Sequence, residues 1–376
     1  MTAVQSGKRL TRIQESDIDL IAIGAAVLGT GGGGDPFVGA LQAKRAIREF
    51  GEIEVLSVEN LPDGGLVAPV GMIGAPSVAV EKIQAAGELS VALNLVEETF
   101  GEPITAIMPT EIGGGNSLVP IAAAAERGLP LVDGDAMGRA FPEAPMVTFH
   151  VAGYSPGIGV LVDPQGNSVV MRPKDGRWAE RIARAVSVEM GGNATMIDYV
   201  FPGSVVRECA IPGTLSTARR IGEILLGEDT RDDERIDVLL CEMNGFRLFN
   251  GKVSSIERSI QGGFTRGRAE LTGLDEDRGA TFELQFQNEM LLATRDGELA
   301  AVTPDLIAVL DLATGRPITT ESLRYGTRVV VVAFSCHAHW RTPAGLETVG
   351  PQYFKYDVEY VAVEDLAEQR KAKEKA

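Results

Sequence analysis

Charged and amide side chains stand beside glycine-rich turns at several points in the first half of the sequence. They fall into two segments, and the residues concerned are Glu111, Asn116, Asp133, Asp135, Arg139 and Glu143. Carboxylates beside glycine turns can be desolvated enough for acid or base work, so together these residues indicate a site. Singly each has a simpler explanation: Asp133 suits the cap of a turn, and Arg139 with Glu143 suits an exposed i,i+4 ion pair worth a few tenths of a kcal/mol.

The loop at residues 29–36 is the most glycine-rich stretch, with consecutive glycines at Gly31, Gly32, Gly33 and Gly34. Glycine permits positive φ and lets a ligand lie directly against backbone N–H groups. Asp35 is a natural N-cap and Pro36 suits the first helical position, so we expect a helix that begins near Phe37. The electropositive end of such a helix favours a carboxylate, a phosphate or a developing oxyanion. The alternative is a structural turn that packs against other backbone.

A nucleotide-binding loop is another interpretation of the same stretch. The pattern G-x-G-x-x-G is present as Gly29, Gly31 and Gly34. A dinucleotide fingerprint follows a strand, however, whereas residues 16–28 have a capping residue and alanine-rich helical spacing. A phosphate loop of the Walker type would continue with Gly-Lys-Ser/Thr, and this loop does not. We therefore expect no NAD or ATP as cofactor.

Two further motifs lie in the second half. Gln287, Asn288 and Glu289 interrupt a β-patterned run, where their amides and carboxylate are placed either to reach substrate across a domain cleft or to bond a neighbouring strand. Cys336, His337 and His339 fall within four residues of a chain that has three histidines in all. Two histidines at i,i+2 face the same side of a strand, as paired zinc ligands often do. A divalent metal such as zinc is one interpretation, and a loop with chance histidines is the favoured alternative.

Hydrophobic patterning predicts an α/β fold whose N-terminal domain has a three-layer, mostly parallel sheet. Buried strands are expected at 52–57, 65–73 and 104–109, with one or two helices at 80–100. A further strand is expected before the acidic turn that begins at Asp133. In open sheets of this kind the site lies beyond the carboxyl ends of the strands. A hairpin at 158–171 and an amphipathic helix at 178–190 follow.

From Ile236 onward the pattern changes to short strands separated by glycine turns, which indicates a β-rich second domain. The expected strands are 237–241, 246–256, 266–272, 281–287, 290–294, 299–303 and 328–335. The acidic stretch 228–235 is expected to be a surface linker, and the charged end at 368–376 to be frayed. The predicted domains are an α/β domain at 12–175, which holds the glycine-rich loops, and a β-rich domain at 176–365 with leading helices.

Composition narrows the class of protein. The chain has 376 residues, enough for about two domains, and a net charge of -17. With no basic stripe, binding to nucleic acid or to an anionic membrane is not expected. The first residues lack the apolar core of a signal peptide, no run approaches the length of a membrane helix, and three cysteines make no disulfide framework. The expected location is cytoplasmic.

Several long motifs together resemble the domain-of-unknown-function 917 family, part of which is named S-methyl thiohydantoin desulfurase. In the first half the motifs are residues 29–36, 71–76, 111–116 and 133–143. In the second half they are residues 262–267, 286–289, 304–307 and 340–343. They occur in the right order over nearly the whole chain.

The resemblance implies a two-domain enzyme, similar to partners of hydantoinase and oxoprolinase pathways, that acts on a five-membered cyclic urea or thiourea derivative. In the named activity, water attacks the ring carbon that bears S-methyl, methanethiol leaves and a hydantoin remains. This chemistry requires a base or bound metal for the water, an acid, and donors for the anionic intermediate. A small cyclic amide is therefore the expected substrate, and a homo-oligomer the expected assembly.

Roles can be hypothesised on the matching motif positions. Asp133 or Asp135 is the expected base, Glu111 an acid or orienting group, and Arg139 the anchor for a substrate carboxylate. The remaining substrate-binding residues are expected to be Gly31, Gly32, Gly33, Gly34, Asp35, Asn116, Glu143 and Asn288. Two other functions stay open: a non-catalytic subunit or partner of a hydantoinase- or oxoprolinase-type enzyme, and a nucleotide-dependent enzyme that uses the first glycine loop.

Overall fold

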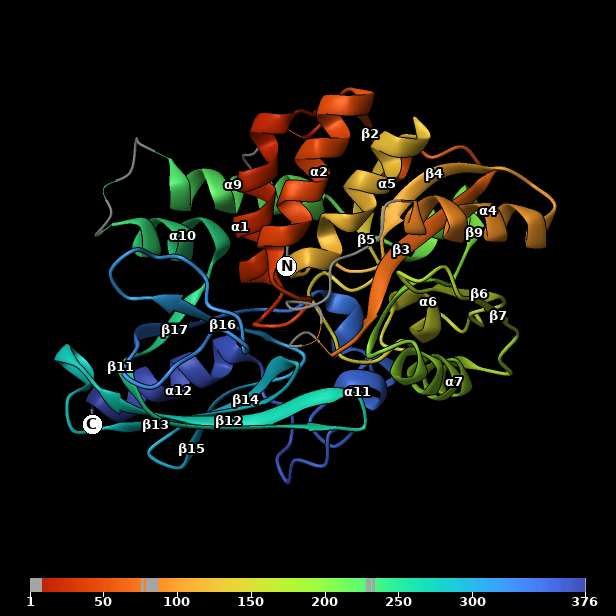
Figure 1. Ribbon diagram of the computed structural model, residues 1–376. Coiled ribbons are helices and arrows are strands. Elements are labelled where there is room, and N and C mark those ends of the chain that lie inside the picture. The colour runs from red at the N-terminus through yellow and green to blue at the C-terminus, as the bar shows by residue number, and fades with distance from the viewer. Residues whose placement is uncertain (1–8, 76–77, 79–86, 228–230, 232–233, 376) are drawn as a thin grey trace.

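The computed structural model describes residues 9–75, 78, 87–227, 231 and 234–375 and contains two sheets (Figure 1). An α/β part occupies the top of the view and a β-rich part lies below it. Most of the expected linker at 228–235, and residues 80–86 of the expected helical segment, lie outside the described residues. Within the described part of the chain, no helix combines the length and the apolar character needed to cross a membrane.

The first sheet is mixed and has a parallel centre. Its strands follow the order β1-β2-β5-β4-β3-β8-β6-β7, with β9 paired to β3 and β10 paired to β5. The bounds are β1 (Arg12–Ile13), β2 (Ile53–Ser57), β3 (Leu66–Gly74), β4 (Ile104–Pro109), β5 (Leu131–Asp135), β6 (Gly159–Val162), β7 (Ser168–Met171), β8 (Asn193–Ile197), β9 (Phe201–Pro202) and β10 (Ile211–Pro212). Strands β2, β5, β4 and β3 run parallel, whereas β8, β6 and β7 are antiparallel to their neighbours. Strand β3 is buried along almost its whole length, as its continuous apolar run predicts.

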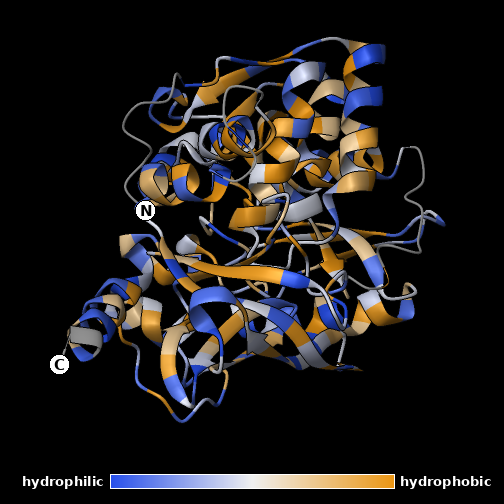
Figure 2. Cartoon of the chain, turned by 90° about the vertical axis from the view of Figure 1, so that its left-hand side faces the viewer, coloured by the Kyte–Doolittle hydropathy of each residue, from blue (hydrophilic) through white to orange (hydrophobic). Residues whose placement is uncertain are grey.

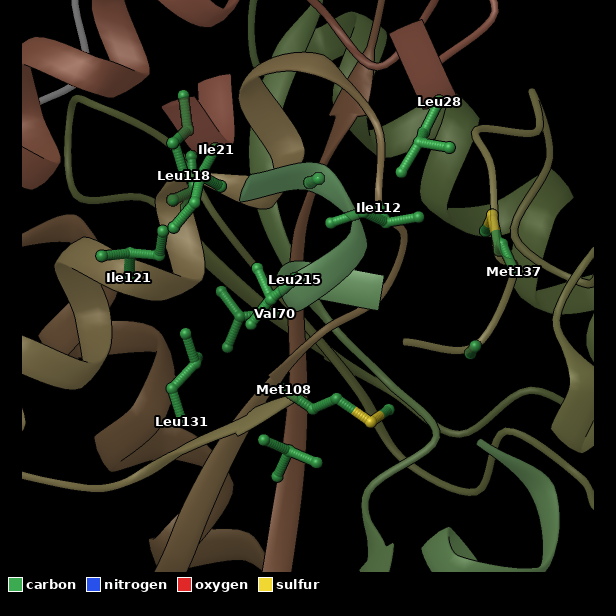
Figure 3. Close-up of a cluster of buried hydrophobic side chains, with 14 of the residues drawn as sticks. Ile21, Leu28, Val70, Met108, Ile112, Leu118, Ile121, Leu131, Met137 and Leu215 are labelled. Carbon is green, nitrogen blue, oxygen red and sulfur yellow. The ribbon is translucent and has the colours of Figure 1, made fainter. Parts of the chain in front are cut away.

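Helices pack on this sheet and bury a large apolar core. Their bounds are α1 (Ile18–Leu28), α2 (Pro36–Phe50), α4 (Glu88–Phe100), α5 (Val119–Arg127), α6 (Thr148–Val151), α7 (Gly176–Glu189), α8 (Gly203–Cys209), α9 (Thr214–Leu226) and α10 (Arg235–Met243). Figure 3 shows part of this core, a cluster of buried side chains to which β3 contributes Val70, α5 contributes Ile121 and α9 contributes Leu215. Behind it, a Cβ at Gly24 would lie 1.8 Å from the carbonyl oxygen of Ala218, so α1 and α9 touch backbone to backbone.

The second sheet is antiparallel throughout and has the order β15-β14-β13-β12-β11-β17-β16. The strands are β11 (Phe246–Gln261), β12 (Phe264–Gly273), β13 (Thr281–Gln287), β14 (Glu289–Arg295), β15 (Glu298–Val302), β16 (Leu306–Asp311) and β17 (Arg328–Phe334). Two helices follow, α11 (Pro343–Val349) and α12 (Val363–Lys375). Coloured by hydropathy, the strands carry many apolar segments, whereas α12 beside the C-terminus is largely polar (Figure 2).

Several expected elements are confirmed and a few were wrong. The helix after the first glycine loop starts as predicted, because Asp35 accepts a hydrogen bond from the Phe37 amide at 2.8 Å and Pro36 takes the first helical position. The expected strand at 237–241 is part of α10, whose buried Ile236, Leu239 and Met243 have helical spacing. Residues 368–375, which were expected to be frayed, belong to α12. Strand β16 was not predicted from the sequence.

The two sheets do not correspond to the two halves of the chain. Strands β8, β9 and β10 come from beyond residue 175 and join the first sheet, so the sheet extends past the α/β domain expected at 12–175. Helix α7 packs beneath β3, β6 and β8 around a second apolar cluster that includes Ala179, Ala183 and Met196. The second half therefore contributes side chains to the same edge of the sheet as the glycine-rich loops.

Candidate active site

Three turns that are far apart in sequence meet in the structure: the first glycine loop (29–36), the second glycine loop (110–117) and the acidic loop (133–143). The amides of Gly115 and Asn116 donate to the carbonyl oxygens of Gly34 and Gly33, at 3.0 and 3.1 Å. A Cβ at Gly113 would stand 2.7 Å from the Cβ of Ala140 in the acidic loop. The glycines are thus needed for close backbone packing, and the structural interpretation of the first loop holds for this part of it.

The same loop also contacts the second sheet. The Thr320 amide donates to the Gly31 carbonyl oxygen at 2.9 Å, and the Met290 amide donates to the Thr30 carbonyl oxygen at 2.8 Å. Gly31 and Gly32 lie inside this junction, whereas Gly33 and Gly34 line a cavity. A Cβ at Gly34 would meet no described atom within 4 Å. The first loop is therefore packed against other segments along its whole length, and at Gly33 and Gly34 it also lines the cavity.

The cavity has a volume of about 340 Å³ and lies between the two glycine loops, the acidic loop, strand β3 and the start of β14. This volume suits a small organic molecule. Its polar lining consists mainly of Asp35, Gln42, Thr110, Glu111, Asn116, Glu143, Arg184, Asn193, Asp198, Asn288 and Glu289. Apolar walls come from Phe37, Val38, Met72, Ile73, Val119, Met137, Phe141 and Met196.

Glu111 is a buried carboxylate on the wall of this cavity. Its Oε1 accepts a hydrogen bond from Asn116 Nδ2 at 2.7 Å, and its Oε2 accepts one from the Phe141 amide at 3.2 Å. Burial raises the pKa of Glu111 to about 8, while these two donors act in the opposite direction. Asn116 is fixed in turn, because its Oδ1 accepts from the Met72 amide of β3 at 3.0 Å. The pair predicted from the second glycine loop is thus assembled at the cavity.

Glu289 is a second buried carboxylate on the cavity wall, and it comes from the second sheet. Its Oε2 has no hydrogen-bond partner among the described residues. Burial raises the pKa of Glu289 well above its ordinary value, and the nearby carboxylate of Glu111 raises it further. A Cβ at Gly32 would stand 2.0 Å from Glu289 Oε1. A side chain at position 32 would therefore collide with this carboxylate, and glycine leaves room for it.

The two expected bases lie behind the cavity rather than on its wall. Asp133 is turned toward α9, where its Oδ1 and Oδ2 accept from the Ser216 amide at 3.0 Å and the Ser216 hydroxyl at 2.6 Å. Asp135 Oδ2 accepts three backbone N–H groups, those of Ile112, Met137 and Gly138, at 2.8 to 3.0 Å. Burial raises the pKa of Asp135 to about 7. Asp133 thus bonds the first turn of α9 and Asp135 holds two loops together, and neither is among the described residues that line the cavity.

Arg139 is also not a free anchor for a substrate carboxylate. It is fully buried, and its guanidinium donates to the carbonyl oxygens of Pro304 and Asp305 and to Thr30 Oγ1, at 2.8 to 2.9 Å. The guanidinium also lies over the ring of Phe141, 4.4 Å from its centroid. Burial lowers the pKa of Arg139 to about 10. Its role in this structure is to tie the acidic loop and the first glycine loop to the second sheet.

The remaining expected binding residues are brought to the cavity. Glu143 accepts from the Tyr353 hydroxyl at 2.6 Å and from Gln287 Nε2 at 3.3 Å, and burial raises its pKa. Asn288 has a positive φ of 57° and accepts from the Thr265 amide at 2.9 Å through its Oδ1. Asn288 therefore bonds a neighbouring strand, and it also lines the cavity.

Sequence reasoning missed two charged residues of the cavity wall. Asp198 directly follows β8, and Glu111 lies just beyond β4, so a carboxylate after a strand was a signal available in the sequence. Arg184 belongs to α7, and nothing in its amphipathic pattern distinguishes it from other surface arginines. The sequence indicated Glu289 only as part of the polar run 287–289, and not as one of the expected catalytic residues.

The metal interpretation of Cys336, His337 and His339 gains no support from the described residues. His337 and His339 stack with ring centroids 4.8 Å apart, and the His339 amide donates to His337 Nδ1 at 3.4 Å. Cys336 is buried, its amide donates to Asp305 Oδ1 at 2.8 Å, and burial raises its pKa to about 12. In the part of the chain that the structure describes, no three His, Cys, Asp or Glu side chains are grouped to hold a metal ion.

This architecture also occurs in another protein of known structure. A crystal structure of a protein from Chromobacterium violaceum has the same fold, with a TM-score of 0.78 and 21% sequence identity over 94% of this chain and 100% of that chain. The comparison with curated proteins found no match. The family models described as S-Me-THD-like, N-terminal domain, and S-Me-THD-like, C-terminal domain, match residues 16–173 and 174–363. The chain therefore belongs to the S-Me-THD-like family.

Proposed function

We propose that this protein is a hydrolase of a small cyclic amide or thiohydantoin, in which water displaces methanethiol from an S-methyl thiohydantoin. The observation that supports the proposal is the pair of buried carboxylates, Glu111 and Glu289, on the wall of one small, largely apolar cavity. Burial and mutual repulsion keep one proton on such a pair near neutral pH, which supplies both a base and an acid.

The contacts support a division of roles between the two carboxylates. Glu111 accepts hydrogen bonds on both oxygens, and these bonds stabilise its charged form. Glu289 keeps one oxygen without a partner among the described residues and has the pKa that is raised further. Glu111 is therefore the carboxylate that ionises first and serves as the base, with a pKa of about 8 that lies close to a working pH. Glu289 holds the proton and serves as the acid.

The reaction then proceeds in two steps. Glu111 takes a proton from water, and the water oxygen forms a bond to the ring carbon that bears S-methyl while the C=N π electrons move to the ring nitrogen. In the second step the C–S bond breaks, the sulfur takes a proton from Glu289, and the hydroxyl proton moves to the ring nitrogen, so that the hydroxyl carbon becomes the carbonyl of a hydantoin. Methanethiol and hydantoin account for all the atoms of substrate and water. Exchange with the solvent then removes the proton from Glu111 and returns one to Glu289, which restores the starting state of the pair.

Backbone donors beside the pair suit the charge that develops on the ring. Gly33 and Gly34 line the cavity, and their amides donate to no atom of the described residues. Fixed N–H donors of this kind stabilise an anionic intermediate without reorganisation. A nucleotide fits less well, because the described lining holds five carboxylates against one guanidinium, that of Arg184.

A thiol-release assay tests the proposal. Purified protein is incubated with S-methyl thiohydantoin, plain thiohydantoin and no substrate, and free thiol is measured with a chromogenic disulfide. We expect thiol only from the S-methylated ring, and a loss of about 100-fold or more in Glu111→Gln and Glu289→Gln. The exposed Glu102 provides the matched control, Glu102→Gln, which should keep full activity. The proposal fails if the wild type releases no thiol without a partner protein, or if both active-site variants remain fully active.

A further inference from the structure

The motif at residues 340–343 packs against the acidic loop. Its Trp340 is fully buried and is not among the described residues that line the cavity. The indole Nε1 donates to the Met137 carbonyl oxygen at 2.7 Å, and the indole lies edge to face with the ring of Phe141, with centroids 4.9 Å apart. Both Met137 and Phe141 line the cavity. Trp340 therefore contacts two residues of the cavity wall without being part of that wall.

The rest of the motif fixes the tryptophan in place. The Arg341 guanidinium donates to the buried carboxylate of Asp305 at 3.0 Å. Thr342 caps α11, because its hydroxyl accepts from the Gly345 amide at 3.1 Å. A Cβ at Gly345 would stand 2.8 Å from the Cα of Trp340, so this helix packs directly on the tryptophan backbone. Since its backbone is anchored in this way, Trp340 is a fixed partner for the acidic loop.

One of these contacts leads to the proposed base. The backbone amide of Phe141 donates to Glu111 Oε2 at 3.2 Å. This bond favours the charged form of Glu111, whereas burial opposes it. The distance lies at the upper end of the usual range for an N–H···O bond, so a small displacement of the Phe141 backbone would weaken it. The position of Phe141 therefore influences how readily Glu111 loses its proton.

Loss of the indole would affect both of its contacts at once. Among the described residues, Trp340 is the only donor to the Met137 carbonyl oxygen. A buried carbonyl without a donor costs free energy, and a smaller ring at position 340 would leave space beside Phe141. Asp135 holds the amides of Met137 and Gly138. The loop would therefore shift mainly beyond these residues, where Phe141 lies.

We propose that Trp340 is a positioning residue, which holds the Phe141 amide in place as a donor to Glu111. The inference rests on the proposed function only for the role of Glu111 as base. Trp340 does not line the cavity, so it acts on the chemistry only through the acidic loop. The second half of the chain thereby sets a hydrogen bond of a carboxylate that the first half carries.

The pKa of Glu111 is the quantity that a merely structural role of Trp340 would not change. Protein labelled with carbon-13 at the glutamate carboxyl carbon is titrated by NMR, and Glu111 is the resonance that is missing in Glu111→Gln. In Trp340→Phe we expect the pKa of Glu111 to rise by about half a unit or more, because a donor to its charged form is weakened. The other tryptophan, Trp178, is 44% exposed. Trp178→Phe is therefore the matched control and should leave this pKa unchanged.

A second replacement keeps the shape of the indole in case Trp340→Phe does not fold. In a Trp178→Phe background, 3-benzothienylalanine supplied in place of tryptophan enters only at position 340 and removes only the N–H. We expect the pKa of Glu111 to rise here too, by less than in Trp340→Phe. A rise in either protein supports the inference. A pKa that is unchanged or lowered in every folded variant would overturn it, even if the urea midpoint falls, because Trp340 would then serve stability alone.

Thiol release separates this inference from the proposed function. For a rise of half a unit, kcat of Trp340→Phe should fall about threefold at pH 7 and recover above pH 9, with KM nearly unchanged. A raised pKa of Glu111 without any thiol release by the wild type supports the positioning role and refutes the hydrolase. Thiol release by the wild type with the same pKa of Glu111 in all variants supports the hydrolase and refutes the positioning role.

Discussion

Replacement of Glu111 by glutamine should change the pH dependence of stability in a direction that the structure predicts. Glu111 has a pKa raised from 4.5 to about 8, chiefly by burial. The folded state therefore binds this proton more tightly than the unfolded state does. The stability that depends on the bound proton is fully present below pH 4.5 and is lost as the pH rises through about 8.

The magnitude follows from the two pKa values. Each tenfold difference in proton affinity is worth about 1.4 kcal/mol. For a rise in pKa from 4.5 to about 8, the free energy of unfolding of the wild type falls by up to about 4 kcal/mol between pH 5 and pH 9. A variant whose residue 111 does not ionise lacks this fall. Glutamine keeps an acceptor for Asn116 but loses the bond from the Phe141 amide, which lowers stability by about 1 to 2 kcal/mol at every pH.

The assay is urea unfolding of wild type and Glu111→Gln at pH 5, 7 and 9, with Glu102→Gln as the exposed control. We expect the difference in free energy of unfolding, variant minus wild type, to grow by up to about 4 kcal/mol from pH 5 to pH 9. The control difference should stay constant because Glu102 is exposed. A difference for Glu111→Gln that is flat across this range would refute the assignment of Glu111 as a buried carboxylate with a raised pKa.

Four other outcomes are expected. The rate of thiol release should rise with an apparent pKa of about 8 as Glu111 ionises, and a rate that falls through this range would contradict its role as base. Arg139→Met should lower the free energy of unfolding by about 3 kcal/mol in urea, because buried carbonyl groups lose their donor; an unchanged midpoint would contradict this. Gly32→Ala should displace Glu289 and reduce kcat about tenfold or more with little change in circular dichroism, and normal turnover would count against the acid. Asp135→Ala should destabilise by about 3 kcal/mol in thermal and urea unfolding, since three backbone amides lose their acceptor; a stable but inactive variant would instead restore Asp135 as a catalytic residue.

Local sequence patterns predicted the parts of the fold that depend on neighbouring residues. Asp35 and Pro36 marked the start of α2, because a cap and a fixed φ act within one helical turn. The continuous apolar run of β3 marked a strand buried on both faces. The error at 237–241 arose where a short apolar run fits a strand and a helix equally well, and packing decided for the helix through Ile236 and Leu239.

The candidate site was predictable only in part. The second glycine loop indicated Glu111 and Asn116, and the structure joins these two side chains at 2.7 Å. The acidic loop indicated Asp133 and Asp135 equally, yet Asp133 is bound to Ser216 of α9, and Asp135 to Ile112 of the second glycine loop and to two amides of its own loop. Nothing within the acidic loop distinguishes a carboxylate that faces a cavity from one that accepts amides behind it.

The sequence by itself determined that glycines, caps and carboxylates follow buried strands, because each of these preferences is a property of a few adjacent residues. Only the tertiary structure decided which carboxylates meet. Glu289 reaches the cavity from the second sheet, and Asp198 reaches it because β8 enters the first sheet beside β3. The free energy that sets these positions comes from contacts between segments more than 100 residues apart, such as the bonds of Arg139 to Pro304 and Asp305, and local patterns carry no record of them.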